Sequence, residues 1–99
     1  MRMLLKVSIP VDAGNRAIQD GSLPKTVDAF VAAHKPEASY FISECGLRTA
    51  LFVFDLKDPT FIPSVAEPFF MGLGAQITLT PAMDLADLRS GVDRLMKQR

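Results

Sequence analysis

The sequence has few of the residues on which catalytic and metal-binding sites are usually built. Its 99 residues include one cysteine, one histidine, one tyrosine and no tryptophan. A single cysteine excludes an intrachain disulfide bond. No catalytic triad, metal-ligand set, phosphate-binding loop or nucleic-acid motif is present, so we expect neither a metal nor a cofactor.

The chain also lacks an excess of charge and a long apolar segment. Eleven basic residues balance eleven acidic ones, which removes the attraction that nucleic acid or an anionic membrane surface requires. The opening MRMLLKVSIP is too short an apolar run for a signal peptide or a membrane span. We therefore expect no nucleic-acid or membrane partner, and a reducing cytoplasm is the simplest location.

The length, and the lack of any repeat, low-complexity tract or linker, indicate one domain over residues 1–99. A chain of this size buries only roughly 60–65% of its unfolded surface, so its core is thin. Residues 1–9 alternate between apolar and polar, as do residues 75–80, and each predicts a half-buried strand. Residues 38–56 predict two strands joined by a tight turn at residues 44–47.

The second strand of this hairpin is apolar on both faces. Ala50, Phe52 and Phe54 alternate along it with Leu51 and Val53. Helices on one side of a sheet would leave the other set uncovered. We therefore predict a second sheet from another copy of the chain, hence a homodimer through the sheet face, with the C-terminal helix of the same chain as the rival cover.

Helices are expected between these strands. Asp12 could cap a short helical turn, and Pro24 could begin a helix that ends before Pro36. Asp58 or Thr60 could cap a further helix, with Gly72 and Gly74 ending it. Asp84 should cap a last helix, whose apolar stripe is Leu85, Leu88, Val92, Leu95 and Met96.

The resulting order is strand, helix, strand, strand, helix, strand and a terminal helix. It predicts an α+β fold, a ferredoxin-like βαββαβ sandwich with a four-stranded antiparallel sheet plus a C-terminal helix. Over the whole chain this layout resembles the dimeric α+β-barrel superfamily. GSLPKT at 21–26, KPEASYF at 35–41 and IPSVAEPFF at 62–70 resemble a family of uncharacterised bacterial proteins of this length. The resemblance implies ligand binding between sheet and helices, without assigning an activity.

A bend is expected at Pro68, which lies inside an otherwise helical segment and cannot donate a backbone hydrogen bond. Such a bend near Ser64 could open a pocket lined by Phe69 and Phe70, with Glu67 at its mouth. It could equally curve the helix over the sheet. Tyr40 could orient a ligand there.

Other polar residues have both a structural and a functional interpretation. Arg16 or Arg48 could clamp a carboxylate, and Asn15 is a further polar candidate, although both arginines are of a type most often found as solvated surface charges. His34 could act as a base or metal ligand if other groups converged on it, but its place at a helix end favours a capping role. Cys45 is expected to be an exposed turn residue with an ordinary thiol.

Two functions of different classes are compatible with these features. The first is a non-catalytic binding or interaction module, working as a homodimer. The second is a cofactor-independent enzyme, similar to a monooxygenase or isomerase, that acts on an apolar or aromatic ligand between sheet and helices. The absence of a recognisable acid–base pair in the sequence favours the first.

Overall fold

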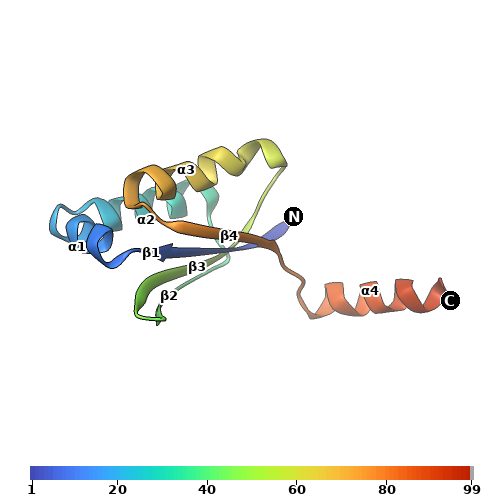
Figure 1. The fold of residues 1–99 in the computed structure, drawn as a ribbon. Coiled ribbons are helices and arrows are strands. Elements are labelled where there is room, and N and C mark those ends of the chain that lie inside the picture. Colours follow the sequence, from blue (N-terminus) through green and yellow to red (C-terminus); the bar gives the residue numbers. More distant parts are fainter. Residues whose placement is uncertain (99) are drawn as a thin grey trace.

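A computed structural model describes residues 1–98 as an α+β fold (Figure 1). Its strands are β1 (Arg2–Ile9), β2 (Ala38–Glu44), β3 (Leu47–Asp55) and β4 (Gln76–Pro81). Its helices are α1 (Val11–Gln19), α2 (Ser22–His34), α3 (Ile62–Leu73) and α4 (Leu85–Lys97), with a short 3-10 turn, η1 (Pro59–Phe61), before α3. The predicted order of strands and helices is confirmed.

The strands form one antiparallel sheet in the order β2-β3-β1-β4. Strand β3 therefore lies between β1 and β2, so the hairpin partner is inserted between two parallel strands as expected. Strand β1 lies in turn between β3 and β4. This arrangement is compatible with the ferredoxin-like pattern.

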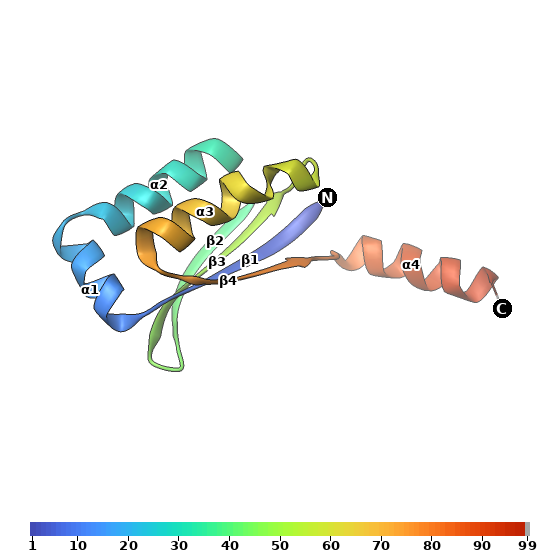
Figure 2. The ribbon, with the colours of Figure 1, turned by 45° about the horizontal axis from the view of Figure 1, so that its top comes forward.

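Helices α1, α2 and α3 cover one face of this sheet, with α2 and α3 side by side (Figure 2). Every second residue of β1 points at them, from Met3 to Ile9, and each is buried. Phe52 on β3 and Phe69 on α3 meet in the same layer, with exposures of 0% and 1%. The core is thus a single layer between the sheet and three helices.

Within residues 1–98 no helix covers the other face of the sheet, and we call this the open face. The register places even-numbered residues of β1, β2 and β4 on it together with odd-numbered residues of β3. Lys6 and Glu44 form an ion pair across it. Leu51 and Val53 lie on this face and Phe52 and Phe54 on the helical face, as their alternation predicted. The large apolar side chains of the open face are Leu4, Tyr40, Ile42, Leu47, Leu51 and Val53.

Helix α4 does not return to the open face of its own chain, which was the rival cover considered above. It projects beyond the end of β4 and away from the body (Figures 1 and 2). The molecule is consequently elongated, with extents of 56 × 29 × 18 Å.

The exact starts of two helices differ from the sequence-based expectations. Asp12 does not cap α1, which begins after Pro10 without a side-chain cap. Helix α2 begins at Ser22 rather than at Pro24, because Gly21 adopts a left-handed conformation with φ of 80° just before it.

Helix α3 is continuous from Ile62 to Leu73 although Pro68 lies inside it, so the proline does not interrupt the helix. Asp58 caps the preceding 3-10 turn by accepting a hydrogen bond from the Thr60 backbone N–H. Gly72 lies within α3, and Gly74 ends the helix with φ of 58°.

Candidate functional site

A broad concave surface with a charged residue in its wall lies between the sheet edge and the first two helices. It encloses about 660 Å³, within the range of small-molecule sites. Helix α1 contributes Asn15, α2 contributes Leu23 and Val27, and the hairpin contributes Phe41 and Arg48. We call this concavity the Arg48 groove.

Two residues singled out in the sequence meet in this groove. Arg48 is on the helical face of β3 and is only partly exposed. Its Nη2 donates a hydrogen bond of 3.1 Å to Asn15 Oδ1. Asn15 therefore orients the guanidinium without neutralising its charge.

Arg48 keeps unused hydrogen-bonding capacity. Among residues 1–98, none of the ion pairs shown by the structure involves Arg48. Arg2 offers the contrast, since Glu37, Asp84 and Asp87 all lie within ion-pair distance of its guanidinium and raise its pKa. A guanidinium has five N–H donors in a planar fork, and a carboxylate of a ligand can take two of them at Arg48.

Gly14 allows Arg48 to lie where it does, and sequence reasoning missed this residue. A Cβ at Gly14 would be 2.7 Å from Arg48 Nη1 and 3.4 Å from Arg48 Cδ. Any larger residue would push the guanidinium away from α1. The available signal was a glycine inside a helical pattern, which weakens a helix and often reflects a close contact.

The walls of the groove are otherwise apolar. Phe41 is 60% exposed, and its ring packs edge-on against Phe52 with centroids 5.8 Å apart. Leu23 and Val27 pack against the core from α2. A ligand with an apolar or aromatic body and one anionic group matches this combination of surfaces.

A second groove of about 380 Å³ runs between α2 and α3. His34 lines it together with Pro68 and Phe69. Burial lowers the pKa of His34, so the imidazole is neutral near pH 7. Its ring packs against Phe30 and Phe54 at centroid distances of 4.9 and 5.7 Å. The end of α2 is capped instead by the Lys35 backbone N–H, which donates to Val31 O.

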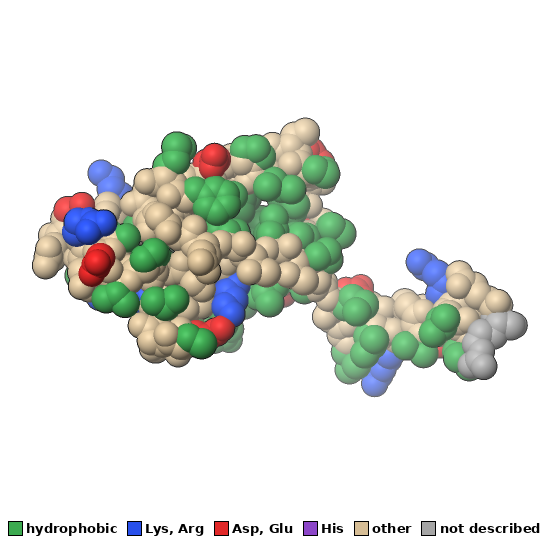
Figure 3. All heavy atoms as spheres, in the orientation of Figure 1, with side chains coloured by type: hydrophobic (Ala, Val, Ile, Leu, Met, Phe, Trp, Pro, Cys, Tyr) green, Lys and Arg blue, Asp and Glu red, His purple; other side chains and the backbone are tan. Residues whose placement is uncertain are grey.

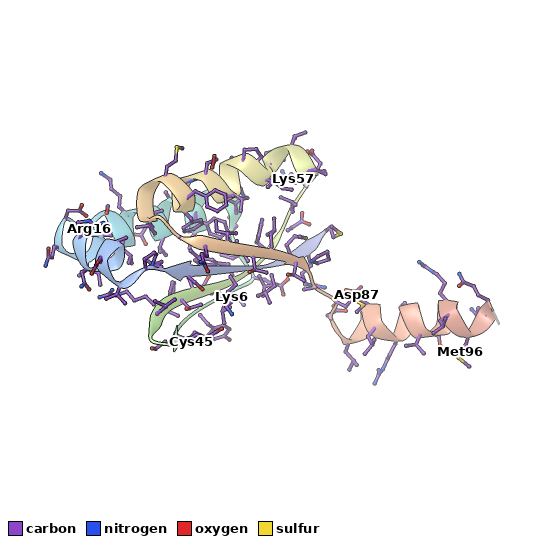
Figure 4. The ribbon with its side chains drawn as sticks, in the orientation of Figure 1. Lys6, Arg16, Cys45, Lys57, Asp87 and Met96 are labelled. Atoms are coloured by element: carbon purple, nitrogen blue, oxygen red, sulfur yellow. The ribbon has the colours of Figure 1, made fainter. Side chains whose placement is uncertain are left out.

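The remaining candidates are dispersed. Tyr40 lies on the open face with 67% exposure, and Phe69 is buried on the helical side, so one pocket cannot adjoin both. Glu67 and Phe70 are exposed on α3 and line neither groove. Arg16 is exposed on α1, at the end of the molecule opposite α4 (Figure 4).

Residues 1–98 hold no group of three or more His, Cys, Asp or Glu side chains placed to bind a metal ion. No helix in the same range is long and apolar enough to cross a membrane. Comparison with protein families, curated proteins and solved structures finds no match for this chain. Its function must therefore be inferred from its own residues and their geometry.

Proposed function

We propose that this chain is a non-catalytic binding protein for a small organic anion, which occupies the Arg48 groove. The observation that carries the proposal is the guanidinium of Arg48, a half-buried residue, which is oriented by Asn15 and has no acidic partner among residues 1–98. The ligand places its carboxylate on Arg48 and its apolar body between Phe41 and α2.

The polar groups of the groove support binding rather than acid–base chemistry. Asn15 and Ser43 line it beside Arg48. Amides and hydroxyls of these types position ligands, whereas none of them exchanges a proton readily near neutral pH. The enzyme alternative fits the α2–α3 groove better, since His34 there is a neutral acceptor. However, no hydrogen bond within residues 1–98 orients the His34 ring, which a general base normally requires.

The test compares phenylacetate with phenylacetamide, a neutral analogue of similar shape. We expect the carboxylate to bind more tightly to the native chain. Arg48→Gln should remove that preference, at a loss of about 1.5–3 kcal/mol in binding free energy, or about 10-fold or more in affinity. Arg16→Gln removes an equal charge outside the groove and should leave the preference intact.

Titration calorimetry gives the affinities, and amide chemical shifts around Asn15 and Phe41 report the location. Equal affinity for the two compounds, or shifts confined to the α2–α3 groove, would disprove the assignment. Failure of both compounds to bind would disprove it as well.

We further infer that the protein works as a homodimer in which a second copy covers the open face. The support is the exposed apolar surface itself: Tyr40, Ile42 and Leu4 are 67%, 42% and 36% exposed on one side of the sheet. Contiguous apolar surface of this kind is unfavourable in water and promotes association. Sedimentation at micromolar concentration tests the dimer independently of ligand binding, and a monomer there would refute it.

A further inference from the structure

Helix α4 carries a second uncovered apolar surface. Leu85, Leu88, Val92 and Leu95 form a stripe along it, which we call the α4 stripe, and they are 61%, 47%, 47% and 57% exposed. The space-filling view shows α4 separated from the body by a narrow neck, with hydrophobic side chains along it (Figure 3).

The start of α4 is held at the end of the sheet by Arg2. Arg2 Nη1 donates to Asp87 Oδ2 at 2.9 Å, and Arg2 Nη2 lies 3.5 Å from Asp84 Oδ2. Asp84 and Asp87 also form a reciprocal capping box in which each side chain accepts from the other's backbone N–H. Asp87 lies at the base of the projecting helix (Figure 4).

The connection between β4 and α4 is too short to let the helix turn back freely. The Ala82 backbone N–H still donates to Arg2 O at 3.0 Å, and Asp84 already caps α4. Only Met83 separates these two anchored positions. Covering the open face of the same chain would therefore require the contacts of Arg2 with Asp84 and Asp87 to break.

A helix of this kind depends on a partner. Isolated helices shorter than about 12–15 residues are marginally stable in water, and α4 has 13 residues. The stripe has the a and d spacing of two heptads, which is shorter than the three or four heptads of a coiled coil that is stable alone. The missing stabilisation has to come from packing against an apolar surface.

We propose that α4 is an exchanged arm, and that the α4 stripe of each copy packs on the open face of the other. This inference rests on the homodimer proposed above and specifies which element forms it. Each chain supplies one uncovered helix and one uncovered sheet face. In a dimer with a two-fold axis, the helix of each chain can therefore cover the sheet face of the other.

The dimensions of the two surfaces agree. A 13-residue helix is about 20 Å long at about 1.5 Å per residue. Four strands spaced about 4.8 Å apart make a sheet of similar width. Two such helix-on-sheet contacts, one in each direction, provide a contact area of the order of the roughly 800 Å² per partner found in stable dimers. A second copy is thus a sufficient partner without any other protein.

Site-specific cross-linking tests the exchange on the full chain. Cys45 is exposed and is first replaced by serine. One preparation then carries Val92→Cys and the other Leu51→Cys, and the two are mixed and oxidised. We expect a disulfide between the chains. The control mixes Val92→Cys with Arg16→Cys. Arg16 lies on α1, at the end of the molecule opposite α4 (Figure 4), so no disulfide is expected there.

A charge in the α4 stripe gives a second, independent readout. Val92→Asp should raise the dimer dissociation constant by about 100-fold or more, because the carboxylate would be buried beside Leu51 and Val53, where Lys6 is already paired with Glu44. Ser90→Asp places the same charge on the polar side of α4 and should leave the dimer unchanged. Amide spectra of residues 1–81 verify that both variants keep the folded body.

The outcomes separate this inference from the proposals on which it depends. A Val92→Asp variant that remains dimeric, together with no cross-link from Val92→Cys, means that the sheets pack directly on each other and overturns the exchange alone. A monomeric native chain overturns both the dimer and the exchange. Neither result changes the phenylacetate test of the Arg48 groove.

Discussion

Arg48 lies across Gly14 so closely that the two residues constrain each other: a Cβ at position 14 would be 2.7 Å from Arg48 Nη1. The atom at 2.7 Å is the end of a flexible side chain, so Gly14→Ala should displace the guanidinium, while the core side chain of Ile9, whose Cγ2 would be 3.3 Å from the new Cβ, shifts by a few tenths of an ångström. The glycine therefore determines the position of the charge in the proposed binding groove rather than the fold of α1.

We predict that Gly14→Ala weakens phenylacetate binding. Gly91→Ala is the matched control, since Gly91 also lies inside a helix but has open space within 4 Å of the position that a Cβ would take. Replacing glycine by alanine within a helix stabilises it by about 0.5–1 kcal/mol. We expect this gain for Gly91→Ala with unchanged affinity, and a reduced or absent gain for Gly14→Ala. Calorimetric titration and thermal unfolding measure the two effects, and unaltered affinity in Gly14→Ala would contradict the proposed role of Arg48.

The adjacent phenylalanines of α3 should differ sharply in their contribution to stability. Phe69 is 1% exposed and its ring lies 5.6 Å from that of Phe30, whereas Phe70 is 46% exposed. Phe69→Ala should lower the free energy of unfolding by about 3–5 kcal/mol because it leaves a cavity in the core. Phe70→Ala should cost less than about 1 kcal/mol. Urea unfolding measures the free energy of unfolding of both variants. Similar losses would show that α3 does not turn Phe69 toward the core and Phe70 toward solvent.

The hairpin turn holds Cys45 in a left-handed conformation with φ of 53°, followed by Gly46 with φ of 75°. Two positive φ values are typical of a type I′ turn, in which Asn-Gly is the favoured pair. Cys45→Asn should therefore stabilise the protein, by up to about 1 kcal/mol, whereas Gly46→Ala should destabilise it by a similar amount. Thermal unfolding of the two variants checks the turn.

The predicted exposure of Cys45 is confirmed, so thiol reagents should label it in the folded state.

The protonation of His34 should make stability depend on pH in a defined range. Its pKa in the folded chain is below the ordinary 6.5 because burial disfavours the imidazolium. The unfolded chain then binds more protons, so the free energy of unfolding falls as the pH drops below 6.5 and is unaffected by this group well above it. Asp20, Asp55, Asp58 and Asp84 have pKa values below 3.8 and titrate in a separate, more acidic range.

His34→Gln should remove the decrease in the free energy of unfolding just below pH 6.5. The decrease at more acidic pH, where the aspartates titrate, should remain. Urea midpoints across the pH range compare the variant with the native chain. A native chain whose stability is constant down to the titration of the carboxylates would mean that His34 is solvated in solution.

Much of the fold could be predicted from the sequence because it depends on local periodicity. Alternation along residues 50–54 placed Phe52 and Phe54 on one face and Leu51 and Val53 on the other, and the register confirms this. The turn at Cys45 and Gly46 and the cap at Asp84 were also recognisable, because each depends on the chemistry of a few neighbouring residues.

The candidate site was decided only by the tertiary structure. Asn15 and Arg48 are 33 residues apart and meet because α1 crosses the end of β3. Tyr40 and Phe69 were expected to share a pocket, but the sheet itself separates them. The position of α4 likewise depends on Arg2, at the opposite end of the chain from Asp84 and Asp87. Periodicity determines which face of an element is apolar, whereas contacts between distant residues determine what each face meets.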